Sequence, residues 1–238
     1  KFTSLLCLVF SSYLVVAQQS PVIEYAAISS FDWSIFKGKV NPKHVAEMGK
    51  NTGAVTVSSI SYSTVDISDR SSTVMITARF HPKESWTRYP NLNNPDQALE
   101  HEKRHMDITE VYARKFRQLV STSHFTASHF QEEIGRLFKE IVSQQREEQT
   151  RYDQETNHSI NTAQQQKWNT QIDRQLEALK AYSTPVLTVT FTHNSSYFFP
   201  SSLPPFRPAS LDPFCLSALP PFRPSSLDPF CLSALPPF

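Results

Sequence analysis

The chain of 238 residues lacks several features on which whole classes of protein depend. It has three cysteines, none of them within residues 18–200, which excludes a disulfide framework or a thiolate zinc site there. A formal net charge of +1 gives no reason to expect a nucleic-acid partner. No apolar run is long enough to cross a bilayer. A metal bound within residues 18–200 must therefore be held by His, Asp or Glu side chains.

Residues 1–17 are typical of a secretory signal peptide. Lys1 gives a basic start, an apolar run of about a dozen residues follows, and Val15-Val16-Ala17 fits a small-residue cleavage site. This run is too short for a membrane anchor. We therefore predict cleavage after Ala17, export to the periplasm or out of the cell, and no stable membrane insertion afterwards.

The residues that follow predict one α+β domain over 18–183, with a small antiparallel sheet first and three helices after it. Alternating apolar and polar residues at 74–80 predict one strand, and a stretch rich in Val, Ile, Ser and Thr at 54–62 predicts its partner, with a turn near 66–71. The second helix is polar all round over 144–151, which predicts that this part projects into solvent. Apolar residues at helical spacing place the helices at about 95–119, 127–152 and 161–182.

The chain beyond this domain is predicted to form a linker, 184–202, and a disordered tail, 203–238. Residues 203–218 recur as 219–234 with a single change, and each 16-residue copy holds four prolines. Such a composition cannot form an ordinary core. One hypothesis is a proline-rich segment that binds a partner as polyproline II. The other, which we prefer, is a repeat expansion or reading-frame extension without a selected role.

The motif that dominates the sequence is His101-Glu102-x-x-His105. On a helix, residues i and i+4 lie one above the other, so the two imidazoles can bind one metal ion. Glu102 is close enough on the same turn to accept a proton from a water that a bound Zn²⁺ has acidified. This pattern is typical of zinc hydrolases, but three fixed residues in five also arise by chance, so the surrounding sequence must support it.

The surrounding sequence predicts a helix with both histidines on its inward face. Asn94 is the predicted N-cap and Pro95 the first helical residue. The apolar stripe continues past the histidines at helical spacing through Ile108, Tyr112, Phe116 and Leu119. The opposite stripe is charged and expected to face solvent. Its members are Lys103, Asp107, Glu110, Arg114 and Arg117. The alternative to a metal site is a pair of histidines at the core edge with ordinary hydrogen bonds.

A catalytic zinc ion usually has three protein ligands. The third is expected from residues 152–158, at the junction of the second and third helices, where a bend could direct side chains toward the first helix. His158 is the preferred ligand, followed by Glu155 and then Asp153. Tyr152 is a candidate stabiliser of the oxyanion. The same residues could instead form a hydrogen-bonded corner between two helices, which does not exclude a ligand role.

Five motifs follow one another along the chain: Trp33-x-x-Phe36-x-Gly38, Ser85-Trp86, Leu99-x-His101-Glu102-x-x-His105-x-Asp107-Ile108-x-x-x-Tyr112-Ala113-Arg114, Tyr152-Asp153-x-Glu155-Thr156-x-His158 and Gln166-x-Trp168. In this order they resemble the bacterial domain-of-unknown-function family 922, over about residues 20–182. The resemblance implies a secreted zinc-dependent protease in which His101, Glu102 and His105 have their usual roles. It leaves the substrate open.

Two residues depart from that family's pattern. Arg104 stands where the family often has a small residue, commonly Gly, just before the second histidine. Its charge would oppose a metal ion if the side chain turned inward. Ser159 stands where the family often has Gly, after His158. Neither change removes a candidate ligand, so both bear on activity and not on the ligand set.

The function predicted from these observations is exported, zinc-dependent hydrolysis of a peptide or protein substrate. His101, His105 and His158 would hold Zn²⁺. Glu102 would act as general base and pass the proton to the leaving amine, and Tyr152 would stabilise the oxyanion. The competing hypothesis is a non-catalytic periplasmic binding or structural module with a structural or vestigial metal site. The sequence does not indicate an oligomeric state.

Overall fold

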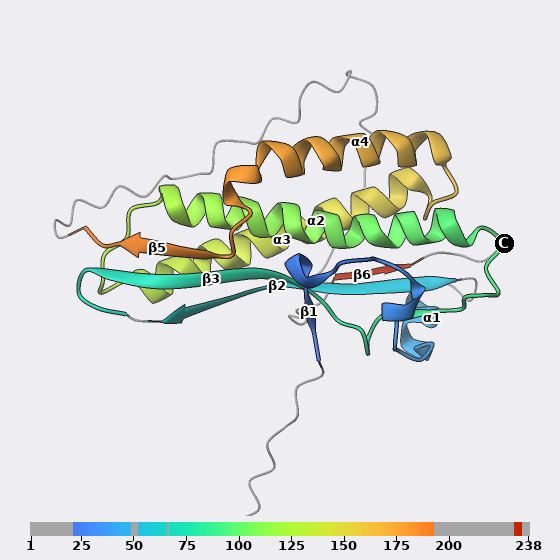
Figure 1. The fold of residues 1–238 in the computed structure, drawn as a ribbon, viewed down its shortest axis with the longest axis horizontal. Coiled ribbons are helices and arrows are strands. Elements are labelled where there is room, and N and C mark those ends of the chain that lie inside the picture. Colours follow the sequence, from blue (N-terminus) through green and yellow to red (C-terminus); the bar gives the residue numbers. More distant parts are fainter. Residues whose placement is uncertain (1–20, 49–51, 66, 193–230, 235–238) are drawn as a thin grey trace, which may run out of the picture.

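The structure, a computed structural model, describes residues 21–48, 52–65, 67–192 and 231–234. It is built of two layers, an antiparallel sheet on one side and three long helices on the other (Figure 1). This is the α+β arrangement that the sequence predicts, with the helices following the central strands. The predicted signal peptide, residues 1–17, lies outside the described residues.

The centre of the sheet is a hairpin of β2 (Ala54–Val65) and β3 (Ser71–Phe80). The two strands pair antiparallel, with Ser58 opposite Phe80 at one end of the ladder. Both predicted strands and the turn between them are thereby confirmed. Successive residues of a strand face opposite sides of the sheet, so alternate residues of β3 enter the core. The buried apolar residues of β3 are Val74, Ile76, Ala78 and Phe80.

Four short strands extend this hairpin into a six-stranded sheet. Two of them, β1 (Ile23–Glu24) and β5 (Val186–Thr190), pair with β3. The other two, β4 (Trp86–Thr87) and β6 (Cys231–Ala234), pair with β2.

Two of these strands fall where the sequence predicts no regular structure. β5 lies in the predicted linker, 184–202, and its β-branched residues favour a strand that packs Val189 into the core. β6 lies in the tail that the sequence predicts to be disordered, 203–238, and its four residues form a strand. It comes from a proline-free stretch of the repeat, 230–235, where every residue can donate to a strand ladder. The rest of the tail lies outside the described residues.

The three long helices are α2 (Pro95–Thr122), α3 (Phe130–Thr156) and α4 (Thr162–Ala178), and a short helix, α1 (Pro42–Met48), precedes β2. They match the three predicted helices, with α3 shifted a few residues toward the C-terminus. α2 is the central element, since it contacts β2, β3, α3 and α4. Asn94 holds the predicted N-cap position, although its side chain makes no capping hydrogen bond.

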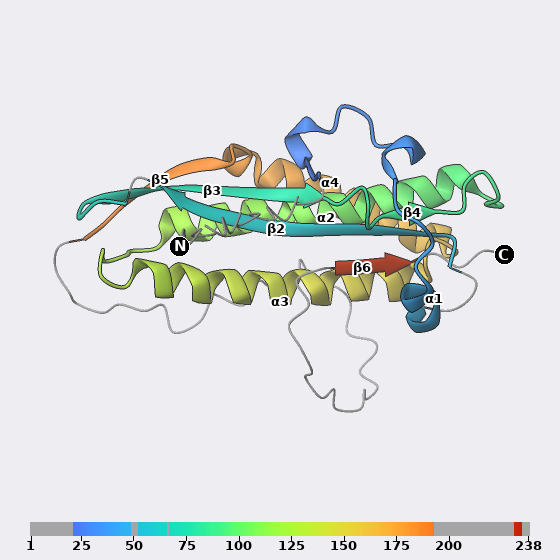
Figure 2. The same ribbon diagram turned by 90° about the horizontal axis from the view of Figure 1, so that it is seen from below.

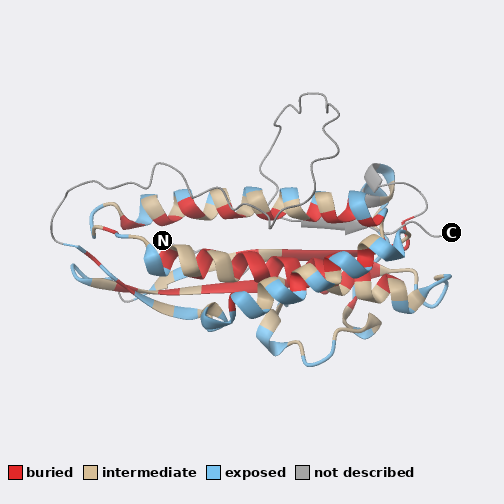
Figure 3. Cartoon of the chain, turned by 90° about the horizontal axis from the view of Figure 1, so that it is seen from above, coloured by how far each residue is buried: buried red, intermediate tan, exposed pale blue. Residues whose placement is uncertain are grey.

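The charged stripe of α2 does not face solvent, which corrects the prediction from the sequence. Asp107, Glu110 and Arg117 are buried, as is much of α2 (Figure 3). The guanidinium of Arg117 donates to the Glu110 carboxylate at 3.0 Å and to the carbonyls of Ile76 at 3.0 Å and Tyr182 at 2.9 Å. Charged groups can be buried when they are paired and hydrogen-bonded, and the spacing of charges along a helix does not reveal this.

The polar part of α3, residues 144–151, does not project into solvent either. Gln145 and Gln149 are buried and face α2. Gln145 Nε2 donates to Thr109 Oγ1 at 2.9 Å, and Gln149 Nε2 reaches the same oxygen at 3.2 Å. The prediction is wrong because these polar side chains satisfy one another across a helix interface.

The segment from Phe31 to Gly38 forms part of the core and ends in a tight turn. Phe36 meets Phe31 and Phe80 edge-on, with ring centroids 5.7 and 5.3 Å away. The backbone N–H of Gly38 donates to the carbonyl of Ser85 at 2.8 Å. A Cβ on Gly38 would lie 2.7 Å from that carbonyl oxygen, so only glycine fits there. This contact fixes the loop that enters β4.

Candidate metal centre

His101 and His105 lie one turn apart on α2, and both are buried. Their rings meet edge to face with centroids 4.7 Å apart, and their Nε2 atoms are 3.1 Å apart. The ring of Tyr152 stacks on that of His101 with centroids 4.5 Å apart, which restrains the imidazole. The two imidazoles of the motif therefore converge on one point.

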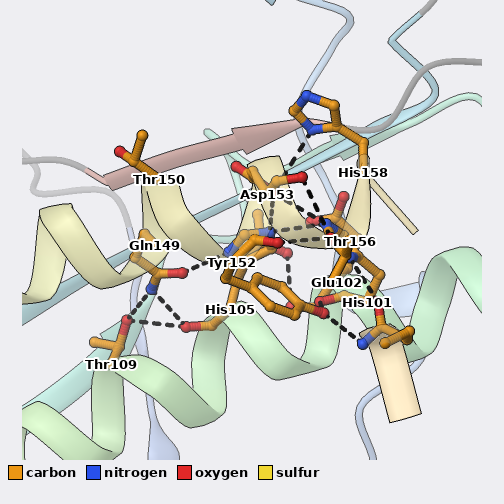
Figure 4. Close-up of polar contacts among 12 residues, drawn as sticks. His101, Glu102, His105, Thr109, Gln149, Thr150, Tyr152, Asp153, Thr156 and His158 are labelled. Carbon is orange, nitrogen blue, oxygen red and sulfur yellow. Dashed lines mark hydrogen bonds and ion pairs between the residues drawn. The ribbon is translucent and has the colours of Figure 1, made fainter. Parts of the chain in front are cut away.

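Asp153, in the last turn of α3, completes a group of three. Its Oδ1 lies 3.1 Å from His101 Nε2 and 3.0 Å from His105 Nε2. The three atoms all lie within 4.8 Å of one another, and Figure 4 shows the three side chains turned toward a common centre. The junction of α3 and α4 thus supplies a donor to the motif. That donor is the third of the three candidates from the sequence.

Two glutamines bind the outer nitrogens of the imidazoles. Gln165 Oε1 is 3.0 Å from His101 Nδ1, and Gln149 Oε1 is 2.5 Å from His105 Nδ1. The Nε2 of Gln149 donates to the carbonyl of His105 at 2.9 Å, which fixes the amide because a carbonyl only accepts. The Nε2 of Gln165 donates at 2.7 Å to the hydroxyl of Tyr152. Both Oε1 atoms therefore accept, and both Nδ1 atoms donate.

This arrangement brings electron pairs together at the centre of the group. A neutral imidazole has one N–H, and when Nδ1 carries it, Nε2 is an acceptor. Both Nε2 atoms and the Asp153 carboxylate then face one another, and they repel unless a cation lies between them. A tetrahedral zinc ion with ligand bonds of ~2.0–2.1 Å would place its ligand atoms roughly 3.3 Å apart. The spacings here are 3.0–3.1 Å, so the residues fit a zinc ion in both chemistry and size.

Sequence reasoning did not identify these two glutamines. For Gln149 the sequence held one signal: Gln145 and Gln149 are one turn apart, on the same face of the predicted second helix. Polar residues at that spacing fit a solvated face equally well, so the pattern alone does not reveal a buried pair.

Glu102 is fully buried beside this group, and neither of its carboxylate oxygens has a hydrogen-bond partner among the described residues. Thr56 is a polar neighbour that lowers the pKa of Glu102 in part, and its Oγ1 donates to the main-chain carbonyl of Glu102 at 3.3 Å. Burial raises the pKa of Glu102 to about 7, against the lowering effects of His101 and Thr56. An unpartnered buried carboxylate is costly, so its presence points to a ligand or substrate group that completes it.

Asp153 has the opposite electrostatic character. Burial alone would raise its pKa, but positive charge at His105 and hydrogen bonds from His101, His105 and His158 hold that pKa well below its usual value when protons, and not a metal ion, bind the two Nε2 atoms. Asp153 is therefore ionised at neutral pH and offers a carboxylate to a cation.

The two other ligand candidates lie outside the group of three. His158 Nδ1 is 3.6 Å from Asp153 Oδ1, so the ring stands beside the carboxylate and its role as a ligand stays a prediction. Glu155 Oε2 accepts a hydrogen bond from Trp168 Nε1 at 2.8 Å, which joins α3 to α4. The helix junction is thus a hydrogen-bonded corner that also supplies a carboxylate able to bind a metal ion, which agrees with the two hypotheses that the sequence left compatible.

Tyr152 has a hydroxyl that serves the scaffold of the site. It is buried, donates to the carbonyl of His101 at 3.2 Å and accepts from Gln165. Burial raises its pKa well above the usual value, in spite of the hydrogen bond from Gln165. These contacts give a positioning role, while oxyanion stabilisation by Tyr152 stays a prediction.

Arg104 does not turn toward His101, His105 and Asp153, which we call the metal-ligand group. Its Nε donates to Glu100 at 2.8 Å, and its Nη1 donates to Asp107 at 3.1 Å and to Asp173 of α4 at 2.5 Å. Three carboxylates therefore hold the guanidinium on another side of α2, and its charge is balanced there.

Comparison with known proteins gives a match to a family model over part of the chain. Residues 53–159 match the family described as bacterial protein of unknown function (DUF922), which confirms the predicted resemblance over that stretch. The matched stretch contains the hairpin, the motif helix and Asp153. No curated protein and no solved structure matches the chain. No helix among the described residues is long and apolar enough to cross a membrane.

Proposed function

We propose that this chain, whose residues 53–159 carry the DUF922 match, is an exported zinc-dependent hydrolase that acts on peptide bonds. Support for the metal comes from the donor set, two imidazoles and a carboxylate, which is common at catalytic zinc. Support for hydrolysis comes from Glu102, which follows the first ligand as in other zinc hydrolases with this motif.

His101 Nε2, His105 Nε2 and Asp153 Oδ1 would hold the ion. When bound, Zn²⁺ would polarise a scissile carbonyl and make a water molecule more acidic. The chain's own contribution is to hold both imidazoles in the tautomer and orientation that a metal ion requires. Gln149 and Gln165 keep the protons on the outer nitrogens and stop the rings from turning, so both Nε2 atoms stay available.

The unpartnered carboxylate of Glu102 is the observation that carries the catalytic proposal. Its pKa of about 7 lets it take a proton from an attacking water and pass that proton to the leaving amine near neutral pH. A purely structural metal site would gain nothing from a buried glutamate without a hydrogen-bond partner. A general base, in contrast, must have a carboxylate that is free to accept a proton.

The test compares zinc-loaded wild type with Glu102→Gln and, as a matched control, Glu100→Gln. Glu100 lies two residues earlier on α2, is half-buried and pairs with Arg104. We expect Glu102→Gln to bind zinc as the wild type does and to hydrolyse a fluorogenic peptide library at least about a hundredfold more slowly. Glu100→Gln should keep the wild-type rate. Equal turnover in wild type and Glu102→Gln would reject the proposal.

A second function, a structural metal clip between α2 and α3, is favoured by the burial of the centre. His101, His105 and Asp153 are 0%, 1% and 8% exposed, and structural zinc sites are closed to solvent. The clip predicts that chelation destabilises the fold while the zinc-loaded wild type hydrolyses no member of the peptide library. Measured hydrolysis that depends on Glu102 would exclude it as the whole function.

A further inference from the structure

The chain's own repeat occupies one edge of β2. β6, residues 231–234, pairs antiparallel with residues 55–58 of β2. Val55 also pairs with β4, and Ser58 also pairs with β3. A strand residue has only two edges, so β6 lies on the edge opposite β3 and β4. Among the described residues, no other strand pairs with this edge at 55–58.

This edge of β2 lies beside the metal-ligand group. Thr56 Oγ1 donates to the carbonyl of Glu102 at 3.3 Å, and Ser58 Oγ is 2.8 Å from Thr109 Oγ1, so both strand residues touch the motif helix. On its other side β6 contacts α3, and Figure 2 shows it running along that helix.

The metal-ligand group is closed in this structure, so a substrate must displace an element to reach it. α2 and α3 are held together by apolar side chains and, over residues 144–151 of α3, by the buried hydrogen bonds of Gln145 and Gln149. β6 is held through backbone pairing of four residues, and each such hydrogen bond contributes little net free energy. Pro229 and Pro236 flank it and lack the N–H that a longer ladder needs. Of the three elements α2, α3 and β6, β6 is therefore the one that can leave most easily.

We propose that Cys231–Ala234 is a self-inhibitory strand, which fills the edge of β2 at 55–58 and must leave before an extended peptide can pair there and reach the metal-ligand group. Pairing at a strand edge uses main-chain groups, so an extended substrate meets the same donors and acceptors that β6 uses. The inhibitory role rests on the proposed function, whereas the occupation of the edge does not.

The test uses the full chain with Glu102→Gln, so that no peptide is cleaved, under reducing conditions. One variant adds Leu232→Pro with Ser233→Pro, which removes two adjacent N–H groups from β6, one of which faces β2. The matched control places the same two changes in the first repeat copy, at Leu216 and Ser217, where the local sequence is identical. A third variant carries all four changes.

The probe is a labelled synthetic peptide of residues 229–236, with binding measured by fluorescence anisotropy. We expect the variant at 232 and 233 to bind it with a Kd at least about tenfold below that of the wild type, because an intramolecular competitor has been removed. The control at 216 and 217 should bind as weakly as the wild type. Hydrogen exchange should show faster exchange at residues 55–58 in the variant and restored protection on adding the peptide.

Equal affinity of the wild type and the four-change variant would overturn the proposal, as would tighter binding without altered exchange at residues 55–58. Tight binding in the four-change variant alone would overturn the assignment of the edge to residues 231–234, because the first copy could then replace them. With Glu102 restored, tight binding without hydrolysis rejects the proposed function and keeps the occupied edge. Hydrolysis at equal rates in all variants, without any gain in peptide affinity, keeps the proposed function and rejects the occupied edge.

Discussion

Protons on the outer nitrogens of His101 and His105 decide what the inner nitrogens can do. The acceptors that hold those protons, Gln149 and Gln165, are neutral. They fix the tautomer without adding charge, so the three ligands carry a single negative charge, on Asp153. A carboxylate behind each ring would make the imidazoles more basic and the centre more negative. The glutamines therefore leave a bound dication with net positive charge, which favours polarisation of a substrate carbonyl.

Replacing Gln149 tests this support directly. Gln149→Met keeps the length of the side chain but removes the acceptor for His105 Nδ1, so we expect zinc affinity to fall by about 10–100-fold. Titration against a chromophoric chelator measures it. Gln144→Met, on the same helix and only partly buried, is the control and should bind zinc as the wild type does. Unchanged affinity in Gln149→Met would mean that the ring needs no such partner.

At the scale of elements, the junction of α3 and α4 aims Asp153 at α2. Three consecutive residues after α3, Asn157, His158 and Ser159, have φ of 46°, 50° and 74°. This left-handed region is unfavourable for residues with a Cβ. The carbonyl of Ser159 accepts a hydrogen bond from Gln97 of α2, which ties the strained turn to the motif helix. Strain in the turn is thus offset by contacts that position the ligand.

Ser159→Gly should relieve part of this strain. Glycine adopts positive φ without a steric penalty, and after its entropic cost we expect a gain of about 0.5–1 kcal/mol in the free energy of unfolding. Urea unfolding of the wild type and the variant measures this. Ser143→Gly, within the exposed face of α3, should change stability in the opposite direction. A loss of stability in both variants would contradict the account of the turn.

The connection between β3 and β4 carries a group that makes stability depend on pH. His81 Nε2 lies 2.7 Å from Ser59 Oγ. Burial lowers the pKa of His81, Glu84 raises it in part, and Arg79 lowers it further. With its folded pKa below the unfolded value of about 6.5, the unfolded chain takes up the proton first as the pH falls. The contribution of neutral His81 is therefore complete above about pH 7 and is lost on acidification.

His81→Gln removes this titration. Between pH 7.5 and 5.5 the free energy of unfolding of the wild type should fall more than that of His81→Gln, because the other titrating groups are common to both chains. Urea unfolding at the two pH values gives the four free energies needed. Equal changes in the two proteins would show that folding does not lower the pKa of His81.

Across the whole molecule, a metal ion would join elements that come from distant parts of the chain. His101 and His105 come from α2, which packs on the sheet, and Asp153 comes from the end of α3. A ligand that binds the folded chain alone stabilises it in proportion to the logarithm of its concentration. Zinc should therefore stabilise the entire two-layer fold, whether or not the centre is catalytic.

We expect zinc at a hundred times its Kd to add about 2.7 kcal/mol to the free energy of unfolding and to raise the Tm by about 5–10 °C. Chelation should reverse the shift, as measured by differential scanning calorimetry. Asp153→Ala should lose the response, and His124→Ala, which changes an exposed histidine after α2, should keep it. An equal shift in wild type and Asp153→Ala would remove Asp153 from the ligand set.

The sequence by itself determined the local features of this protein. Helical spacing indicated the three helices and placed His101 and His105 on one face, because this periodicity follows from backbone geometry. Alternation at 74–80 indicated β3, and a stretch rich in Val, Ile, Ser and Thr at 54–62 indicated β2. The same reasoning placed a metal donor in residues 152–158 but not its identity. The identity of the donor depended on where α3 ends. The helix continues four residues beyond its predicted end at residue 152, so Asp153 lies in its last turn.

Only the tertiary structure decided which polar groups are buried and what they contact. Gln149 and Gln165 behind the imidazoles, Arg117 between the layers and β6 on the edge of β2 all depend on partners far away in the sequence. A polar residue at helical spacing fits a solvated surface and a satisfied interface equally well. The difference lies in whether another element supplies the matching donor or acceptor, and that is settled by packing in three dimensions.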